Sequence, residues 1–159
     1  MATIRIIVTN EVTGRTRMYS EFRRKGRWKL VPTYKMIVRH EKKSIEFAVT
    51  RDTATQIFGI GNYLECPASV HRKPFHAWVR EDNQRGFRLQ LCESLEKDPN
   101  TLIGRGSKTR SLLQIHRGPS KSHGCLSVAG GDKTYKAFEE TLKKFLRKTR
   151  KIRVTVQQR

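Results

Sequence analysis

Residues 132–150 form the only segment of the chain with the sustained helical periodicity of an amphipathic helix, and this limits the fold class. Glutamates precede lysines by four positions, as in Glu139 before Lys143, and Asp132 follows two glycines as the expected N-cap. We therefore expect one late helix, with an apolar face that packs on the core and consists of Tyr135, Phe138, Leu142, Phe145 and Leu146.

The rest of the chain consists of short β-branched and aromatic runs, which are typical of strands. Residues 3–8 and 15–22 flank a polar segment, 9–14, and this pattern predicts an opening hairpin with Gly14 in its turn. The prediction is a mainly β (β-rich α+β) protein, with a single domain over residues 1–159. Further strands are expected at 28–40, 43–51, 73–81, 86–94, 111–116 and 151–158, with loops at 82–85 and 97–110.

The chain is strongly basic, with 34 lysines and arginines against 14 acidic residues and a net charge of +20. A hydrophobic content of 36% is enough for a folded core, so this charge must face water or a polyanion. No window has the roughly 18 apolar residues of a membrane span, and the start of the chain has no Sec-type pattern. The expectation is synthesis in the cytoplasm, with no membrane insertion and another delivery route for any role outside it.

The three cysteines, Cys66, Cys92 and Cys125, are odd in number and widely spaced, which does not suggest a disulfide framework. No CxxC pair suggests zinc or a redox dithiol. Cys66 and Cys92 lie in apolar surroundings and are expected to be small core residues.

Cys125 lies in a stretch with different chemistry, LLQIHRGPSKSHGCLSVAGG, over residues 112–131. Cysteine nucleophiles need a thiolate, a base, and N–H donors for an oxyanion. His116 ends an apolar strand-like run, and an eight-residue loop returns the chain to Cys125, while Gly124 lets the backbone approach a substrate. His123 offers a second imidazole, and nearby Arg117 and Lys121 favour a thiolate and attract a carboxylate.

The residue types alone leave other interpretations of this stretch open. A histidine after a buried strand is often a hydrogen-bonded rim residue, and a cysteine beside a leucine is often a buried structural thiol. Metal binding is disfavoured, because the two candidate ligands in HGC are too close in sequence for common structural zinc spacings.

Residues 115–128, with IH, a short loop, SHGC and an aliphatic residue, resemble the signature of the L,D-transpeptidase (YkuD-like) superfamily. The resemblance implies a YkuD-like β-sandwich or barrel with one helix after the catalytic cysteine, and neither a cofactor nor a metal. Cys125 would attack a peptidoglycan stem-peptide carbonyl to form a thioester, with His116 as general base and acid. The main chain of Arg117 or Gly118 would orient His116, and Gly124 and Cys125 would supply oxyanion amides.

The resemblance also implies a substrate pocket and a range of outcomes. His123 and Ser122 would shape the acyl pocket, with Arg117, Ser127 and Tyr63 as further substrate contacts; His76 and Trp78 are weaker candidates for the cleft wall. An amine acceptor would give transpeptidation or exchange, and water would give carboxypeptidase or endopeptidase activity.

Two features depart from the housekeeping enzymes of the family: the loop before Cys125 is about half as long, and Ser127 replaces a common arginine or asparagine. The chain is more similar to compact type VI secretion effectors and phage-associated relatives. This implies an antibacterial toxin that acts in the periplasm or cell wall after delivery by a secretion system, with an adaptor and an immunity protein as partners.

Two other classes compete with the enzyme. Lysines and arginines interleave with aromatic residues in FRRKGRW, residues 22–28, as in proteins that bind single-stranded nucleic acid. A degenerate domain that keeps the fold as a binding module is the third hypothesis. The complete set of His116 and SHGC favours the enzyme, while the basic charge does not discriminate, because both partners are anionic.

Overall fold

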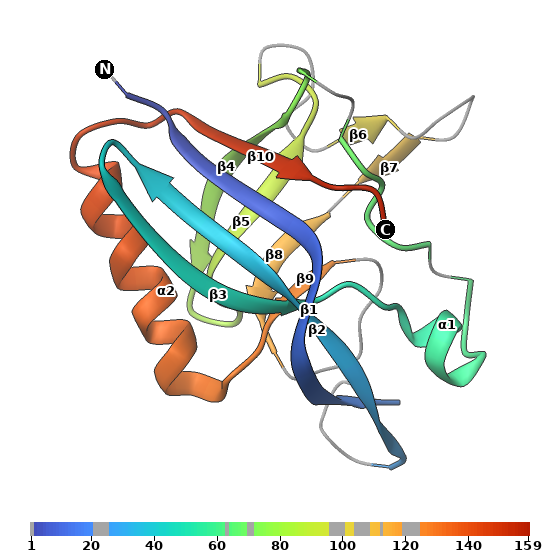
Figure 1. Ribbon diagram of the computed structural model, residues 1–159. Coiled ribbons are helices and arrows are strands. Elements are labelled where there is room, and N and C mark those ends of the chain that lie inside the picture. Colours follow the sequence, from blue (N-terminus) through green and yellow to red (C-terminus); the bar gives the residue numbers. More distant parts are fainter. Residues whose placement is uncertain are drawn as a thin grey trace.

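The computed structural model describes residues 2–20, 26–62, 64–69, 72–95, 113–118 and 125–159, together with the backbone of 101–103 and 109–111. The fold is mainly β, an eight-stranded closed barrel with mixed strand directions and two helices (Figure 1). Around the barrel the order is β1 (Ile4–Tyr19), β10 (Ile152–Val156), β4 (Phe75–Asp82), β5 (Gly86–Cys92), β8 (Gln114–Arg117), β9 (Leu126–Val128), β3 (Lys43–Thr50) and β2 (Trp28–His40).

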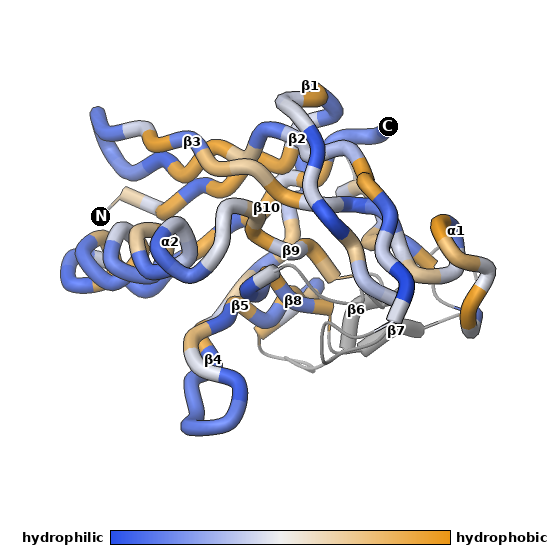
Figure 2. The backbone as a smooth tube through the Cα atoms, turned by 90° about the horizontal axis from the view of Figure 1, so that it is seen from below, coloured by the Kyte–Doolittle hydropathy of each residue, from blue (hydrophilic) through white to orange (hydrophobic). Residues whose placement is uncertain are grey.

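Six neighbouring pairs in the barrel are antiparallel, whereas β1 with β10 and β8 with β9 run parallel. The β1–β10 pair joins the two ends of the chain, since Ile4 lies opposite Ile152 and Val8 opposite Val156. The predicted last strand is therefore confirmed. Hydrophobic and hydrophilic residues alternate along the strands in Figure 2, as expected when one face of each strand is buried.

The late helix, α2 (Gly131–Leu146), is confirmed and buries Tyr135, Phe138, Leu142 and Phe145. Phe138 packs edge-on against Phe47 of β3, with 5.3 Å between ring centroids, so the helix shares one core with the barrel. The predicted Asp132 cap is wrong: Gly130 is the N-cap, with a φ of 108° that favours glycine, and Asp132 lies in the first turn.

The predicted opening hairpin is also wrong. Residues 4–19 form one continuous strand, β1, which pairs with β2 almost throughout. The pairing of β1 with β2 shifts register between Val8 and Val12 and between Val12 and Gly14, so the polar segment contains bulges or similar irregularities. These irregularities bend the strand, but the chain does not reverse direction.

Two further elements differ from expectation. Helix α1 (Ala54–Phe58) was missed, although Thr53 and Gln56 form a capping box and Gly59 ends the helix in the left-handed conformation. The segment predicted as a loop at 97–110 contains β6 (Thr101–Ile103), which pairs with β7 (Thr109–Ser111) in a separate two-stranded sheet.

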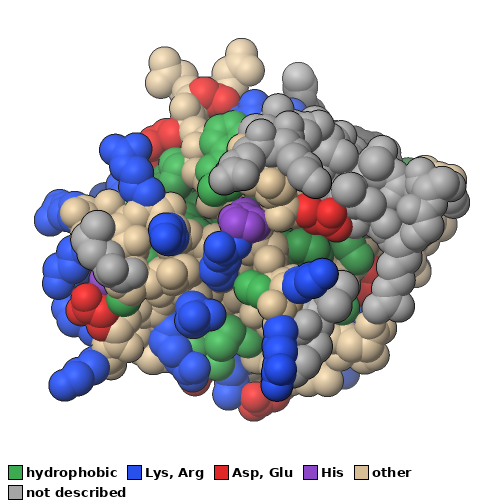
Figure 3. Space-filling model, turned by 90° about the horizontal axis from the view of Figure 1, so that it is seen from above, with side chains coloured by type: hydrophobic (Ala, Val, Ile, Leu, Met, Phe, Trp, Pro, Cys, Tyr) green, Lys and Arg blue, Asp and Glu red, His purple; other side chains and the backbone are tan. Residues whose placement is uncertain are grey.

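The surface visible in Figure 3 carries lysines and arginines with aspartates and glutamates among them. Several of these charges form ion pairs, including Lys143 with Glu81 at 3.0 Å and Lys35 with Glu11 at 2.9 Å. Within the described residues, no helix is both long and apolar enough to span a membrane.

Candidate active site

The candidate site is built on the parallel pair β8 and β9. Ile115 lies opposite Leu126, and His116 lies opposite Ser127. Ile115 and Leu126 are fully buried in the core, so His116 and Ser127 occupy the other face of the sheet. Cys125 immediately precedes β9 and is two residues from Ser127, so alternation continued one residue beyond the strand would place it on the same face as His116.

The register also sets the spacing of the predicted reacting pair. Adjacent strands lie about 4.8 Å apart and two residues span about 6.6 Å, so the Cα atoms of His116 and Cys125 are roughly 8 Å apart. Cys125 is half-buried, and all three cysteines carry thiols rather than disulfides. Cys66 and Cys92 are buried, as expected for core residues.

The imidazole of His116 is held by the main chain. Its Nδ1 lies 2.9 Å from the carbonyl oxygen of Arg117. Because a carbonyl oxygen can only accept a hydrogen bond, Nδ1 carries the proton, and Nε2 of the neutral ring keeps its lone pair. The contact implied by the resemblance is therefore present, whereas the catalytic role of His116 stays a prediction.

Electrostatics favour the neutral form of this ring. Burial lowers the pKa of His116 below its ordinary value of 6.5, and the positive charges of Arg85 and Arg88 lower it further. The hydrogen bond to the Arg117 carbonyl opposes these effects without outweighing them. At neutral pH, His116 is thus able to accept a proton at Nε2.

Two buried glutamines that sequence reasoning missed extend this polar face. Gln114 on β8 lies opposite Gln90 on β5, and the Gln114 Nε2 donates to Gln90 Oε1 at 3.0 Å. The Nε2 of Gln90 has no hydrogen-bond partner in the described part of the chain. A period-two pattern could have revealed them, because polar residues alternate with leucine in RLQLC, residues 88–92, and Gln114 and His116 flank Ile115.

On the other side of Ser127, the polar row continues into β3. Ser127 lies opposite Thr50, which in turn lies opposite Thr33 of β2. The side chains of Ser127 and Thr50 are only 2% and 4% exposed, and neither hydroxyl has a hydrogen-bond partner among the described residues. Buried hydroxyls without partners are unusual in folded proteins and suggest a bound molecule.

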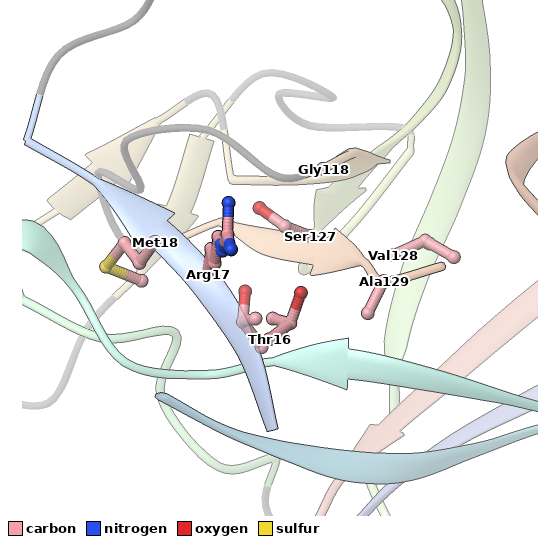
Figure 4. A pocket seen from close by; sticks show the side chains of 8 residues that line it. Thr16, Arg17, Met18, Gly118, Ser127, Val128 and Ala129 are labelled. Carbon is pink, nitrogen blue, oxygen red and sulfur yellow. The ribbon is translucent and has the colours of Figure 1, made fainter. Parts of the chain in front are cut away.

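A cavity of about 10 Å³ lies beside these hydroxyls, which is room for roughly one water molecule. Figure 4 shows it between the far end of β1 and strand β9. Gly118 keeps the cavity open: a Cβ at this position would lie 3.0 Å from the Cβ of Ser127 and 3.2 Å from the Val128 carbonyl oxygen. The lining residues are Thr16, Arg17, Met18, Thr50, Gly118, Ser127, Val128 and Ala129.

Not every predicted site residue joins this face. Arg117 points to the other side of β8, by strand alternation, and its guanidinium lies 3.3 Å from Asp132 of α2. His76 on β4 contacts Arg153 of β10 and is separated from β8 by β5. Trp78 does join this face, because it lies opposite Gln90 and its half-buried side chain is therefore on the same face. The remaining candidates, Gly124, His123, Ser122 and Tyr63, lie outside the described residues.

The described residues contain no cluster of three or more histidine, cysteine, aspartate or glutamate side chains placed to hold a metal ion. The site is instead a polar face of β5, β8, β9 and β3, with His116 on β8 and Cys125 directly before β9. Comparisons with protein-family models, curated proteins and solved structures find no match for this chain.

Proposed function

We propose that the protein is a cysteine-dependent enzyme of the L,D-transpeptidase type, with a YkuD-like fold, that acts on peptidoglycan stem peptides. The observation that carries this proposal is the oriented imidazole: His116 donates from Nδ1 to the Arg117 carbonyl, and it lies on β8, which pairs with the strand that Cys125 directly precedes. Imidazole and thiol in this arrangement are the components of acyl transfer through a thioester.

In the proposed reaction, Nε2 of His116 takes the thiol proton of Cys125, and the thiolate attacks the carbonyl carbon of the stem peptide. Collapse of the tetrahedral intermediate breaks the C–N bond, and His116 returns the proton to the departing amine. An acceptor amine or water then attacks the thioester, transfers a proton to His116 and releases the thiolate. The first acceptor gives transpeptidation or exchange, and the second gives hydrolysis.

The buried polar face supports this assignment. Gln90, Gln114 and Ser127 place amide and hydroxyl groups on both sides of the reacting pair, at a distance from the apolar core. Such groups suit a substrate made of peptide bonds, because each offers a hydrogen-bond donor and an acceptor. Ser127 in place of an arginine or asparagine makes this part of the pocket uncharged.

The test compares four proteins on purified muropeptides with tetrapeptide and pentapeptide stems, analysed by mass spectrometry. We expect new stem-peptide masses with the wild type and with Cys66→Ala, and none with Cys125→Ala or His116→Gln. Cys66→Ala is the matched control, because it removes a buried thiol that lies outside this face. Identical products from all four proteins would overturn the proposal.

A second measurement addresses the chemistry without a substrate. Alkylation of Cys125 by iodoacetamide, mapped by peptide mass, should be faster than that of Cys66 and Cys92 at pH 7 and should slow in His116→Gln. Equal rates at Cys125 with and without the imidazole would show that His116 does not activate the thiol.

Delivery to the cell envelope belongs to the same proposal. An antibacterial effector needs a secretion-system adaptor and an immunity partner, and its target lies in the periplasm or cell wall. Directing the wild type to the periplasm of a bacterium should arrest growth, whereas Cys125→Ala should not. Equal growth of the two strains at equal protein levels would contradict a toxic role.

A further inference from the structure

Beyond the candidate active site, β1 and β2 continue together past the edge of the barrel (Figure 1). In this ribbon, Arg17 lies opposite Leu30, and Tyr19 lies opposite Trp28, so the four side chains share one face. Trp28 is 47% exposed and Leu30 is 55% exposed, which is unusual for large apolar side chains on a strand. The ribbon therefore presents an aromatic ring to the solvent.

Cations lie over the aromatic rings of this region. The Arg17 guanidinium carbon is 4.2 Å from the centroid of the Trp28 ring. On the adjoining helix α1, the ring of Phe58 has Arg27 at 5.8 Å and Lys29 at 5.6 Å, and the Lys29 ammonium donates to the Ile57 carbonyl at 3.2 Å. Lys29 lies opposite Met18, so strand alternation places Lys29, and the Phe58 ring that it contacts, on the other face of the ribbon from Trp28. We call the face with Arg17, Tyr19, Trp28 and Leu30 the aromatic–cation surface.

The sequence around this surface is strongly basic. Residues 14–29 contain seven lysines and arginines and one glutamate. In the described part of the chain, Arg17, Arg27 and Lys29 form no ion pair with a carboxylate, in contrast to Lys35, Arg88, Arg117 and Lys143. Cations without an acidic partner attract a polyanion, and an exposed aromatic ring favours a polyanion with planar groups that can stack on it.

We propose that the aromatic–cation surface binds single-stranded nucleic acid, with a base stacked on Trp28 and phosphates near Arg17. The unpaired bases of a single strand are available for stacking, whereas duplex bases are covered by their neighbours. An anionic membrane suits the surface less well, because among the described residues Trp28 and Leu30 are its only strongly exposed large apolar side chains, and they are flanked by charges.

This activity is distinct from the proposed catalysis, because Trp28 does not line the cavity beside Ser127, although Arg17 does. The experiment measures binding of the full chain to labelled oligothymidine and to the matching duplex, both by fluorescence anisotropy, and to anionic phospholipid vesicles. Each measurement is made at two salt concentrations. We expect the single strand to bind more tightly than the duplex or the vesicles, with affinity that falls steeply as salt rises.

Substitutions locate the binding surface. Trp28→Ala should weaken single-strand binding by about 5- to 100-fold, the range for loss of one stacked base, while Trp28→Phe should retain most of it. Arg17→Gln should reduce the slope of log affinity against log salt concentration by the amount expected for the loss of about one phosphate contact. The matched control is Trp78→Ala on β4, where Arg80 lies 5.6 Å from the Trp78 ring, and this change should leave binding unaltered.

The outcomes separate this inference from the proposed enzyme. Cys125→Ala should bind the oligonucleotide as the wild type does, so loss of one activity does not imply loss of the other. Equal weakening by Trp28→Ala and Trp78→Ala, equal affinity for single strand and duplex, or binding to vesicles alone would overturn the proposal.

Discussion

Gly118 is the position where the smallest change should have the largest effect on the candidate site. An alanine Cβ there would lie 3.0 Å from the Ser127 Cβ and 3.2 Å from the Val128 carbonyl oxygen. That oxygen already accepts a hydrogen bond from the Gly118 amide at 3.1 Å, so neither backbone can move without weakening the β8–β9 connection. We expect Gly118→Ala to destabilise the protein by about 1–3 kcal/mol, the usual cost of overpacking.

The assay is equilibrium urea unfolding followed by circular dichroism. With a slope of roughly 2 kcal/mol per molar urea, this cost lowers the midpoint by about 0.5–1.5 M. The matched control is Gly14→Ala on β1, where the added Cβ would lie 3.7 Å from Thr33 Oγ1, an ordinary contact. The control should change stability by less than about 0.5 kcal/mol. Equal midpoints for the two variants would refute the idea that Gly118 is constrained by Ser127 and Val128.

Three other predictions concern buried polar groups. Thr50→Val should lower stability by about 1 kcal/mol in urea unfolding, as expected for a hydroxyl that a water molecule in the neighbouring cavity would satisfy; a gain in stability would show that the cavity is dry. Burial lowers the pKa of His116, so folding favours its neutral form, and stability should fall as pH drops below about 6.5. In His116→Gln, stability should depend less on pH in this range, and the same pH dependence as in the wild type would contradict the prediction. Burial raises the pKa of Glu65, but hydrogen bonds from Arg159 at 2.9 and 3.0 Å outweigh that effect and hold it below 4.5. The stability contributed by Glu65 is therefore present above pH 4.5 and is lost as pH falls through the lower pKa of the folded state. In thermal melts between pH 5 and 3, Arg159→Gln should lose less stability than the wild type as pH falls. Parallel curves for the two proteins would refute this prediction.

Periodicity predicted the elements in which local and tertiary preferences agree. The strands at 28–40 and 43–51 and the helix face at Tyr135 and Phe138 follow from alternation and from the helical repeat. The opening hairpin failed because residues 9–14 have turn chemistry, whereas β2 is long enough to pair with both flanking segments. Non-local pairing overrode the local signal. The capping box of Thr53 and Gln56, by contrast, was a readable local signal for α1.

The sequence suggested candidate residues for the site but not their geometry. The motif identified His116 and Cys125, and a short loop between them is readable in the sequence. Whether both lie on one face depends on the parallel register of β8 and β9, which pairs His116 with Ser127. Thr50 joins the row only through the antiparallel β3–β9 pair, about 75 residues away along the chain, so no local pattern could identify it.

The two proposed activities meet on β1. Thr16, Arg17 and Met18 line the cavity beside Ser127, and the guanidinium carbon of Arg17 lies 4.2 Å from the centroid of the Trp28 ring. Substitutions at Thr16 or Met18 would therefore disturb both the cavity and the backbone that presents Arg17. Trp28 does not line the cavity, so Trp28→Ala changes the aromatic–cation surface alone. If Trp28→Ala also altered turnover of muropeptides, the ribbon would contribute to the enzyme, and the basic charge would then serve the envelope substrate rather than a nucleic acid.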